Sequence, residues 1–167
     1  MREREGPVAQ RWEGEGVTQI YVDADACPVR EEVYRVAGRL GVKVSVVWNG
    51  SRPIRPPHLP FVEMVMVGEA MDAADDWIAE RIAAADICVT ADIPLASRCL
   101  QKGARVVSPN GRPFTAANIG NALAGRELSR HLRELGAGGG GPPPFTKADR
   151  SRFLSALDTA VQAALRG

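Results

Sequence analysis

Aspartates follow three separate apolar segments of this sequence. Several carboxylates gathered in one cleft repel one another, and a divalent cation removes that repulsion. Because every ligand would be an oxygen, Mg²⁺ or Mn²⁺ is favoured over zinc. Such an ion can bind a phosphodiester and generate hydroxide for in-line attack. The residues that could form this site are Asp23 and Asp25 after the first segment, Asp72 and Asp75 after the second, and Asp92 after the third.

Most of these aspartates also have a purely structural interpretation. Asp25 and Asp92 precede predicted helices and Asp72 begins one, and a carboxylate in these positions can accept a hydrogen bond from the first turn. Asp23 is harder to explain as a cap, because it directly ends an apolar segment several residues before the helix. Acids at the ends of three different segments favour a metal site over three unrelated caps.

Apolar periodicity predicts the elements that must position these acids. Short β-branched runs predict strands, and apolar residues at helical spacing predict the helices that alternate with them. This alternation indicates the α/β fold class, as a three-layer, doubly wound and mostly parallel sheet, which binds ligands outside the carboxyl ends of its strands. Asp72, Asp75 and Asp76 have the i, i+3, i+4 spacing of one helix face. The predicted strands are 20–22, 42–48, 61–67, 86–90 and 104–108, and the predicted helices are 29–40, 72–84, 94–102, 118–135 and 146–165.

The chain has the size and composition of one globular domain. Its 167 residues are 45% hydrophobic and 25% charged, which is typical of a folded protein. Residues 1–16 mix Arg with Glu and lack the apolar core of a secretory signal, so we expect a disordered extension there and a cytoplasmic protein. No apolar run approaches the roughly 18 residues of a membrane span. Residues 17–167 then form a single domain, with a Gly/Pro-rich loop at 136–144 before the terminal helix.

The net charge of +1 conceals an uneven distribution. Residues 61–97 contain eight acids and one base, whereas residues 98–152 contain ten bases and three acids. This pattern is typical of a metal site with a phosphate-holding rim, although two solvated helix faces would also produce it. Cys27, Cys88 and Cys99 form no C-x-x-C pair, which argues against a disulfide framework and against zinc. We interpret them as packed thiols.

Three motifs connect these acids to a known family. They are Asp23-Ala-Asp25-Ala-Cys27-Pro28, Asp72-x-x-Asp75 and Thr90-Ala-Asp92-Ile-Pro94-Leu95-Ala96. With them, residues 20–160 resemble the YaiI/YqxD family of uncharacterised bacterial proteins. Asn110 stands where that family often has Arg. Further matches, in the order of the family, are Lys102-Gly103-Ala104, Pro109-x-Gly111, Thr115, Asn118-Ile119, Gly140-Gly141-Pro142, Asp149-Arg150 and Phe153.

The family is grouped with the PIN-like domains, many of which are metal-dependent ribonucleases. The resemblance therefore implies a Mg²⁺- or Mn²⁺-dependent nuclease, acting on single-stranded RNA. It implies Asp23, Asp75 and Asp92 as metal ligands, with Asp25 and Asp72 supporting them or holding a second ion. The catalytic set would be Asp23, Asp25, Asp75 and Asp92, and the candidate substrate contacts are Thr90, Lys102, Asn118 and Arg126.

Other functions stay open. Asp23-x-Asp25 after an apolar strand also matches the opening motif of haloacid-dehalogenase-type phosphatases, in which the first aspartate is the nucleophile. Against this, Cys27 replaces the usual Thr or Val, and no later strand ends in the acid pair that would hold Mg²⁺. A non-catalytic RNA- or protein-binding module would keep the same fold, and a homo-oligomer is also open. Because aromatic residues make up only 5% of the chain, we expect nucleic-acid contacts mainly to phosphates.

Overall fold

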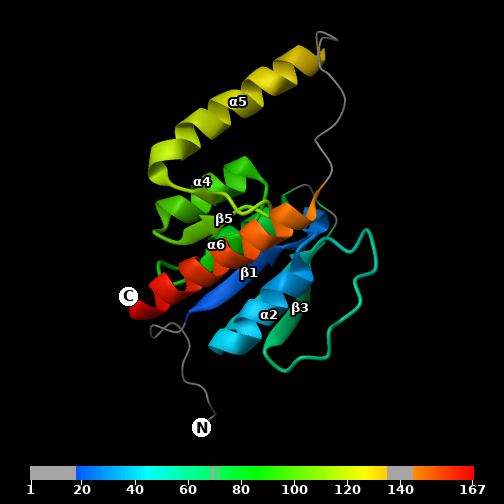
Figure 1. The fold of residues 1–167 in the computed structure, drawn as a ribbon. Helices are drawn as coiled ribbons and strands as arrows, with labels where there is room; N and C mark the ends of the chain where they lie inside the picture. The colour runs from blue at the N-terminus through cyan, green and yellow to red at the C-terminus, as the bar shows by residue number, and fades with distance from the viewer. Residues whose placement is uncertain (1–17, 69, 71, 135–144) are drawn as a thin grey trace.

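The computed structural model describes residues 18–68, 70, 72–134 and 145–167, without the side chains of residues 26 and 126–134 (Figure 1). The predicted N-terminal extension, residues 1–16, and the predicted Gly/Pro-rich loop, residues 136–144, lie outside the described residues.

Within the described residues, six strands form one sheet in the order β3-β2-β1-β4-β5-β6. All neighbouring pairs are parallel except β5 and β6, which are antiparallel. The central strands are short and carry β-branched side chains that are buried on both faces, as parallel sheets require. The strands are β1 (Gln19–Asp23), β2 (Lys43–Trp48), β3 (Val62–Met66), β4 (Ile87–Val89), β5 (Arg105–Val107) and β6 (Pro113–Phe114).

Helices cover both faces of the sheet (Figure 1). α2 and α6 pack against each other on one face, and α3 and α4 lie on the other face. α5 follows β6 and contacts α4. No helix of the described residues is both long and apolar enough to cross a membrane. The bounds are η1 (Ala24–Ala26), α2 (Arg30–Leu40), α3 (Ala73–Arg81), α4 (Ile93–Gln101), α5 (Ala116–Glu134) and α6 (Lys147–Arg166).

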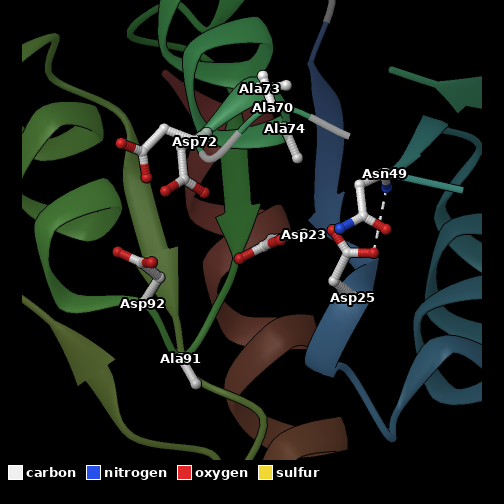
Figure 2. Close-up of a pocket in the computed structure, with 10 residues that line it drawn as sticks. Asp23, Asp25, Asn49, Ala70, Asp72, Ala73, Ala74, Ala91 and Asp92 are labelled. Atoms are coloured by element: carbon white, nitrogen blue, oxygen red, sulfur yellow. Dashed lines mark hydrogen bonds between the residues drawn. The ribbon is translucent and has the colours of Figure 1, made fainter. Parts of the chain in front are cut away.

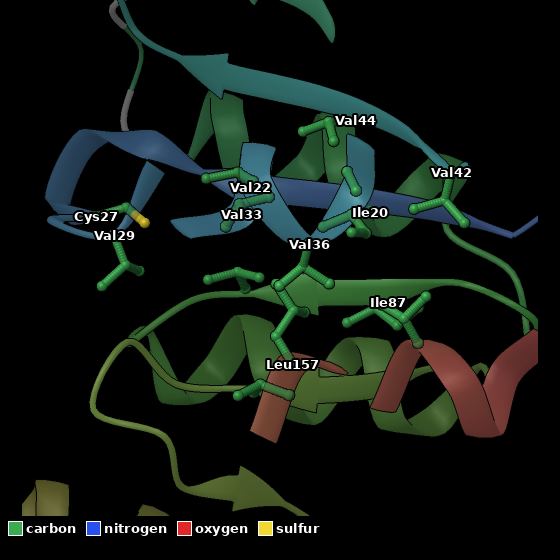
Figure 3. Close-up of a cluster of buried hydrophobic side chains, with 14 of the residues drawn as sticks. Ile20, Val22, Cys27, Val29, Val33, Val36, Val42, Val44, Ile87 and Leu157 are labelled. Atoms are coloured by element: carbon green, nitrogen blue, oxygen red, sulfur yellow. The ribbon is translucent and has the colours of Figure 1, made fainter. Parts of the chain in front are cut away.

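Two apolar clusters fill the spaces between the layers. Figure 3 shows the cluster under α2 and α6, to which β1 contributes Ile20 and Val22. Tyr21, which lies between these two residues, points to the opposite face and belongs to the second cluster, under α3 and α4. Since successive side chains of a strand point to opposite faces, Asp23 projects toward the side of α3 and α4. Alternation along one strand therefore decides which helices surround this acid.

Local signals determine where the helices start and stop. Gly41 ends α2 with φ of 73°, and its N–H donates to the carbonyl of Ala37 at 2.8 Å. A capping box begins α6: Thr146 Oγ1 accepts from the N–H of Asp149 at 3.1 Å, and the N–H of Thr146 donates to Asp149 Oδ2 at 2.9 Å. These bonds satisfy groups that a helix end would otherwise leave unpaired.

The predicted fold class is confirmed, and each predicted strand and helix is present with small shifts in its bounds. β6 and η1 are additional elements. One local prediction is wrong. The three acids Asp72, Asp75 and Asp76 do not share a helix face, because Asp72 precedes α3 in a left-handed conformation with φ of 69°.

Candidate active site

The topology creates a crevice at the carboxyl ends of β1 and β4. The chain moves outward from β1 through β2 to β3, and then returns to the other side of β1 as β4. Connections therefore leave the carboxyl ends of β1 and β4 in opposite directions, which opens a ligand site in doubly wound sheets. A cleft of about 470 Å³ lies there (Figure 2). Its polar lining consists of Asp23, Asp25, Asn49, Asp72, Asp75 and Asp92.

A buried hydroxyl connects the acids of the two central strands. Thr90, 1% exposed, directly follows β4. Its Oγ1 donates to Asp23 Oδ2 at 2.8 Å and accepts from the N–H of Asp92 at 2.9 Å. Asp92 in turn caps α4, because its Oδ1 accepts from the N–H of Leu95 at 2.9 Å. The cap interpretation of Asp92 is confirmed, and the same side chain also lines the cleft.

Asp75 enters the cleft from the first turn of α3, and its pKa is strongly raised. Burial is the largest cause, followed by the negative charges of Asp92, Asp23 and Asp72 and a hydrogen bond with Asp92, which together raise the pKa of Asp75 to about 7. The pKa of Asp23 is also raised, first by burial and then by Asp92 and Asp25, against the lowering effect of the Thr90 hydrogen bond. No Lys or Arg of the described chain lines the cleft to offset this charge.

Asp25 is oriented differently from the acids of β1, α3 and α4. It is exposed in η1, and its Oδ1 accepts from the N–H of Asn49 at 3.1 Å. In Figure 2 it lies with Asn49 on the other side of Asp23 from Asp72 and Asp92. Asp25 therefore joins the end of β1 to the end of β2, and it caps no helix among the described residues.

Asp72 and its neighbour Asp76 have different environments. Asp72 occupies the N-cap position of α3 but makes no capping hydrogen bond, and its exposed carboxylate lines the cleft. Asp76 forms an ion pair with Arg98 at 2.8 Å, outside the cleft. Asp72 is thus available to a ligand, whereas Asp76 is engaged elsewhere.

The donor chemistry of the cleft suits a hard divalent cation, because every acidic side chain in it offers oxygen. The side chains do not converge on one point, however. No group of three or more His, Cys, Asp or Glu among the described residues lies close enough to hold an ion. Thr90, Leu95 and Asn49 each engage one carboxylate oxygen, those of Asp23, Asp92 and Asp25 respectively. Ion binding would therefore require these carboxylates to turn inward.

The other predicted substrate contacts lie away from this cleft. Lys102 follows the end of α4. This helix runs from the cleft to the opposite end of the sheet, where the amino ends of the parallel strands lie. Asn118 is in the first turn of α5, and its side chain forms hydrogen bonds with Thr115 and Pro113. Because β6 is antiparallel to β5, the chain has by then returned to the amino ends of the parallel strands. Arg126 is on α5, with a side chain outside the described part. The structure brings Thr90 to the acids, and it does not bring Lys102 or Asn118 there.

Two further residues clarify what the sequence signals mean. Asn49, which was not among the predicted site residues, directly follows β2 and lines the cleft; the strand-end rule that selected the acids would also have found it. Cys27 is buried in the core cluster under α2 and α6, and burial raises the pKa of its thiol to about 11. Cys27 is therefore a packed thiol, as expected, and carries no nucleophilic thiolate at neutral pH.

Comparison with known proteins identifies the family. A family model described as "Uncharacterized BCR, YaiI/YqxD family" matches residues 21–163. A UPF0178 protein of Paramagnetospirillum magneticum is 59% identical over 150 residues, which cover 90% of this chain and 98% of the relative. A UPF0178 protein of Sphingopyxis alaskensis is 58% identical over 149 residues, covering 89% and 96%. No solved structure matches the chain. The protein described here therefore belongs to the YaiI/YqxD family.

Proposed function

We propose that this protein is a Mg²⁺- or Mn²⁺-dependent nuclease that hydrolyses phosphodiesters of single-stranded RNA. One observation carries the proposal. Asp23, Asp75 and Asp92, from three separate elements, face one cleft at the switch point of the sheet, and no Lys or Arg side chain that the structure describes lines it. Structural caps do not need to meet in this way, because each could satisfy its own helix alone.

The raised pKa of Asp75 supports a divalent cation as the ligand of the acids in the cleft. A carboxyl group with a pKa of about 7, raised by burial and three neighbouring carboxylates, shows that adding the last negative charge to the cleft is unfavourable. A divalent ion would reverse this effect and favour the ionised form of every acid around it. The resemblance to PIN-like nucleases, which rests on the same residues, points in the same direction.

The residues have separate roles in this proposal. Asp23, Asp75 and Asp92 would hold the ion, Asp72 would support them, and Asp25 would complete the set or orient the attacking water. Bound there, the ion would polarise the phosphate and lower the pKa of a water molecule. Thr90 positions Asp23 through its 2.8 Å hydrogen bond.

Cleavage of end-labelled single-stranded RNA with added Mn²⁺ tests the proposal. Wild type should cleave, whereas Asp23→Asn should lose at least about a hundredfold in rate, the order expected when a metal ligand or its partner is removed. Asp76→Asn is the matched control, because it makes the same change one residue beyond Asp75 at an exposed ion pair outside the cleft.

The alternatives predict different results. Retained cleavage in Asp23→Asn would contradict the site assignment. Hydrolysis of a phosphate monoester without RNA cleavage would support the phosphatase interpretation of Asp23-x-Asp25. RNA binding without cleavage at any Mn²⁺ or Mg²⁺ concentration would support the non-catalytic module.

A further inference from the structure

Two hollows continue from the carboxylate cleft on the side of Asp25. The first, of about 510 Å³, shares Asp25 with the cleft and is lined by Arg30, Arg52 and Trp48. The second, of about 780 Å³, shares Arg30 with the first and lies between α2 and the proline-rich connection from β2 to β3. Three adjoining hollows thus lead from the aspartates to the outer face of α2.

The charge of the lining changes sign along this path. The second hollow adds Arg35, Arg39 and Arg55, with Glu31 as its acidic residue among the described side chains. Arg39 is engaged by Asp158. The remaining four arginines (Arg30, Arg35, Arg52 and Arg55, here called the arginine track) form no ion pair with any carboxylate of the described chain. Arg30 also donates to the carbonyl of Cys27 at 3.4 Å. Guanidinium groups without a carboxylate partner are available to an anionic ligand.

An aromatic side chain stands where the two regions of opposite charge meet. Trp48 ends β2 and lines the first hollow together with Arg30 and Arg52. Its indole Nε1 donates to the carbonyl of Arg52 at 3.1 Å, which fixes the ring against the loop that carries this arginine. A fixed aromatic ring beside arginines is the arrangement on which unpaired bases stack in single-strand binding proteins.

Hydrogen bonds couple the track to the candidate active site. The N–H of Asn49 donates to Asp25 Oδ1 at 3.1 Å, and Asn49 Oδ1 accepts from the N–H of Ser51 at 2.9 Å (Figure 2 shows the first bond). The backbone that leads into Arg52 is therefore held directly by one of the cleft carboxylates.

Three of the ten bases in residues 98–152 are engaged by acids. Arg98, Arg150 and Arg152 form ion pairs with Asp76, Glu32 and Asp149 respectively. The charge pattern favours this segment as a phosphate-holding rim, but among the described residues the arginines that line the two hollows beyond the cleft come from α2 and the proline-rich connection.

We propose that the arginine track is the binding path of a single-stranded polynucleotide, whose phosphates contact Arg30, Arg35, Arg52 and Arg55 and one of whose bases stacks on Trp48. The proposal rests on the proposed function for the role of the cleft, and it adds the direction from which the strand enters. RNA and DNA share the phosphodiester chemistry, so the experiment compares them.

Fluorescence anisotropy with labelled oligouridylate and oligothymidylate in EDTA tests the track on the full chain without cleavage. Arg52→Gln/Arg55→Gln should weaken binding at least about tenfold and reduce the slope of log K against log salt by about 1.4, because each lost phosphate contact contributes about 0.7 for single strands. The control Arg105→Gln/Arg166→Gln removes the same charge at the other end of the sheet, at the start of β5 and the end of α6. It should leave the salt dependence of binding unchanged.

A change without loss of charge tests the stacking site. Trp48→Leu should weaken binding several-fold at an unchanged salt slope, because stacking involves no counterion release; thermal unfolding of the variant verifies that it is folded. Tighter binding of oligouridylate than of oligothymidylate assigns RNA as the ligand, and the reverse order assigns DNA.

The outcomes separate this proposal from the proposed function. Absence of binding by wild type, or equal losses in the two double variants, overturns the track. Track-dependent binding without Mn²⁺-dependent cleavage overturns the nuclease and leaves the track standing. Cleavage with an unchanged KM in Arg52→Gln/Arg55→Gln overturns the track and leaves the nuclease standing.

Discussion

Thr90 Oγ1 donates a 2.8 Å hydrogen bond to Asp23 Oδ2 at the switch point of the sheet, where the connections after β1 and β4 leave in opposite directions. The hydroxyl is buried and also accepts from the N–H of Asp92. One threonine therefore sets the position of an acid on the neighbouring strand and orders the loop that presents a second acid. This arrangement keeps two like charges in one cleft.

Replacing Thr90 with Val removes this hydrogen bond while preserving the side-chain shape. A hydrogen bond to a charged group that is partly exposed contributes about 1–2 kcal/mol, so the free energy of unfolding at pH 8 should fall by that amount. Urea unfolding measures it, with exposed Thr159→Val as the control. Equal unfolding free energies for Thr90→Val and wild type would show that the bond has no energetic role.

Asp75 makes the metal-free protein sensitive to pH. Its pKa is raised from 3.8 to about 7 on folding, so the folded state binds the proton more tightly and loses stability as the pH rises from about 4 to about 7. Asp75→Asn should therefore be more stable than wild type at pH 8, by about 1–2 kcal/mol after allowance for solvent screening of a half-exposed group.

Urea unfolding in EDTA across this pH range measures the difference. The gain in Asp75→Asn should shrink as the pH falls and disappear below about pH 4, where both proteins are neutral at this position. Asp76→Asn should show no such gain, because Asp76 is paired with Arg98. A gain that is independent of pH would contradict the electrostatic explanation.

Gly111 has a packing role that accounts for its place in the Pro109-x-Gly111 motif. Its φ is 89°, and a Cβ there would lie 2.7 Å from the backbone carbonyl carbon of Arg152 and 2.8 Å from the backbone nitrogen of Phe153. Gly111→Ala should therefore destabilise the protein by roughly 2 kcal/mol or more, through strain and displacement of α6.

Gly120 provides the contrast, because it lies within α5 and a Cβ there meets nothing within 4 Å. Gly120→Ala should be neutral or stabilise the protein by about 0.5–1 kcal/mol. Thermal unfolding of the two variants distinguishes the effects. Similar melting temperatures for both would show that the close approach to α6 is unimportant.

The sequence was sufficient to predict the fold and the meeting of the acids. Periodicity predicts the alternating strands and helices, and the strand-end rule selects Asp23 and Asp92 from the sequence alone. It was insufficient where placement depends on three dimensions. Residue spacing does not reveal that Asp72 has a left-handed backbone. Nor does it reveal that β6 runs antiparallel to β5 and so carries Asn118 away from the cleft.

The sequence also does not show which arginines are free to bind a ligand. Composition points to residues 98–152, because ten bases stand against three acids there. Which cations are engaged depends on partners distant in sequence, such as Glu32 for Arg150 and Asp76 for Arg98. Arg52 and Arg55 are near in sequence to a run of prolines, and only the folded chain places them beside α2.

Calorimetric titration of Mn²⁺ into chelator-treated protein tests the central claim most directly, since it depends on neither substrate nor cleavage. The account predicts saturable binding to wild type and to Asp76→Asn, and binding at least about tenfold weaker in Asp23→Asn, a loss of about 1.4 kcal/mol or more. Equal binding to wild type and Asp23→Asn would contradict the claim that Asp23 and its neighbours form a metal site.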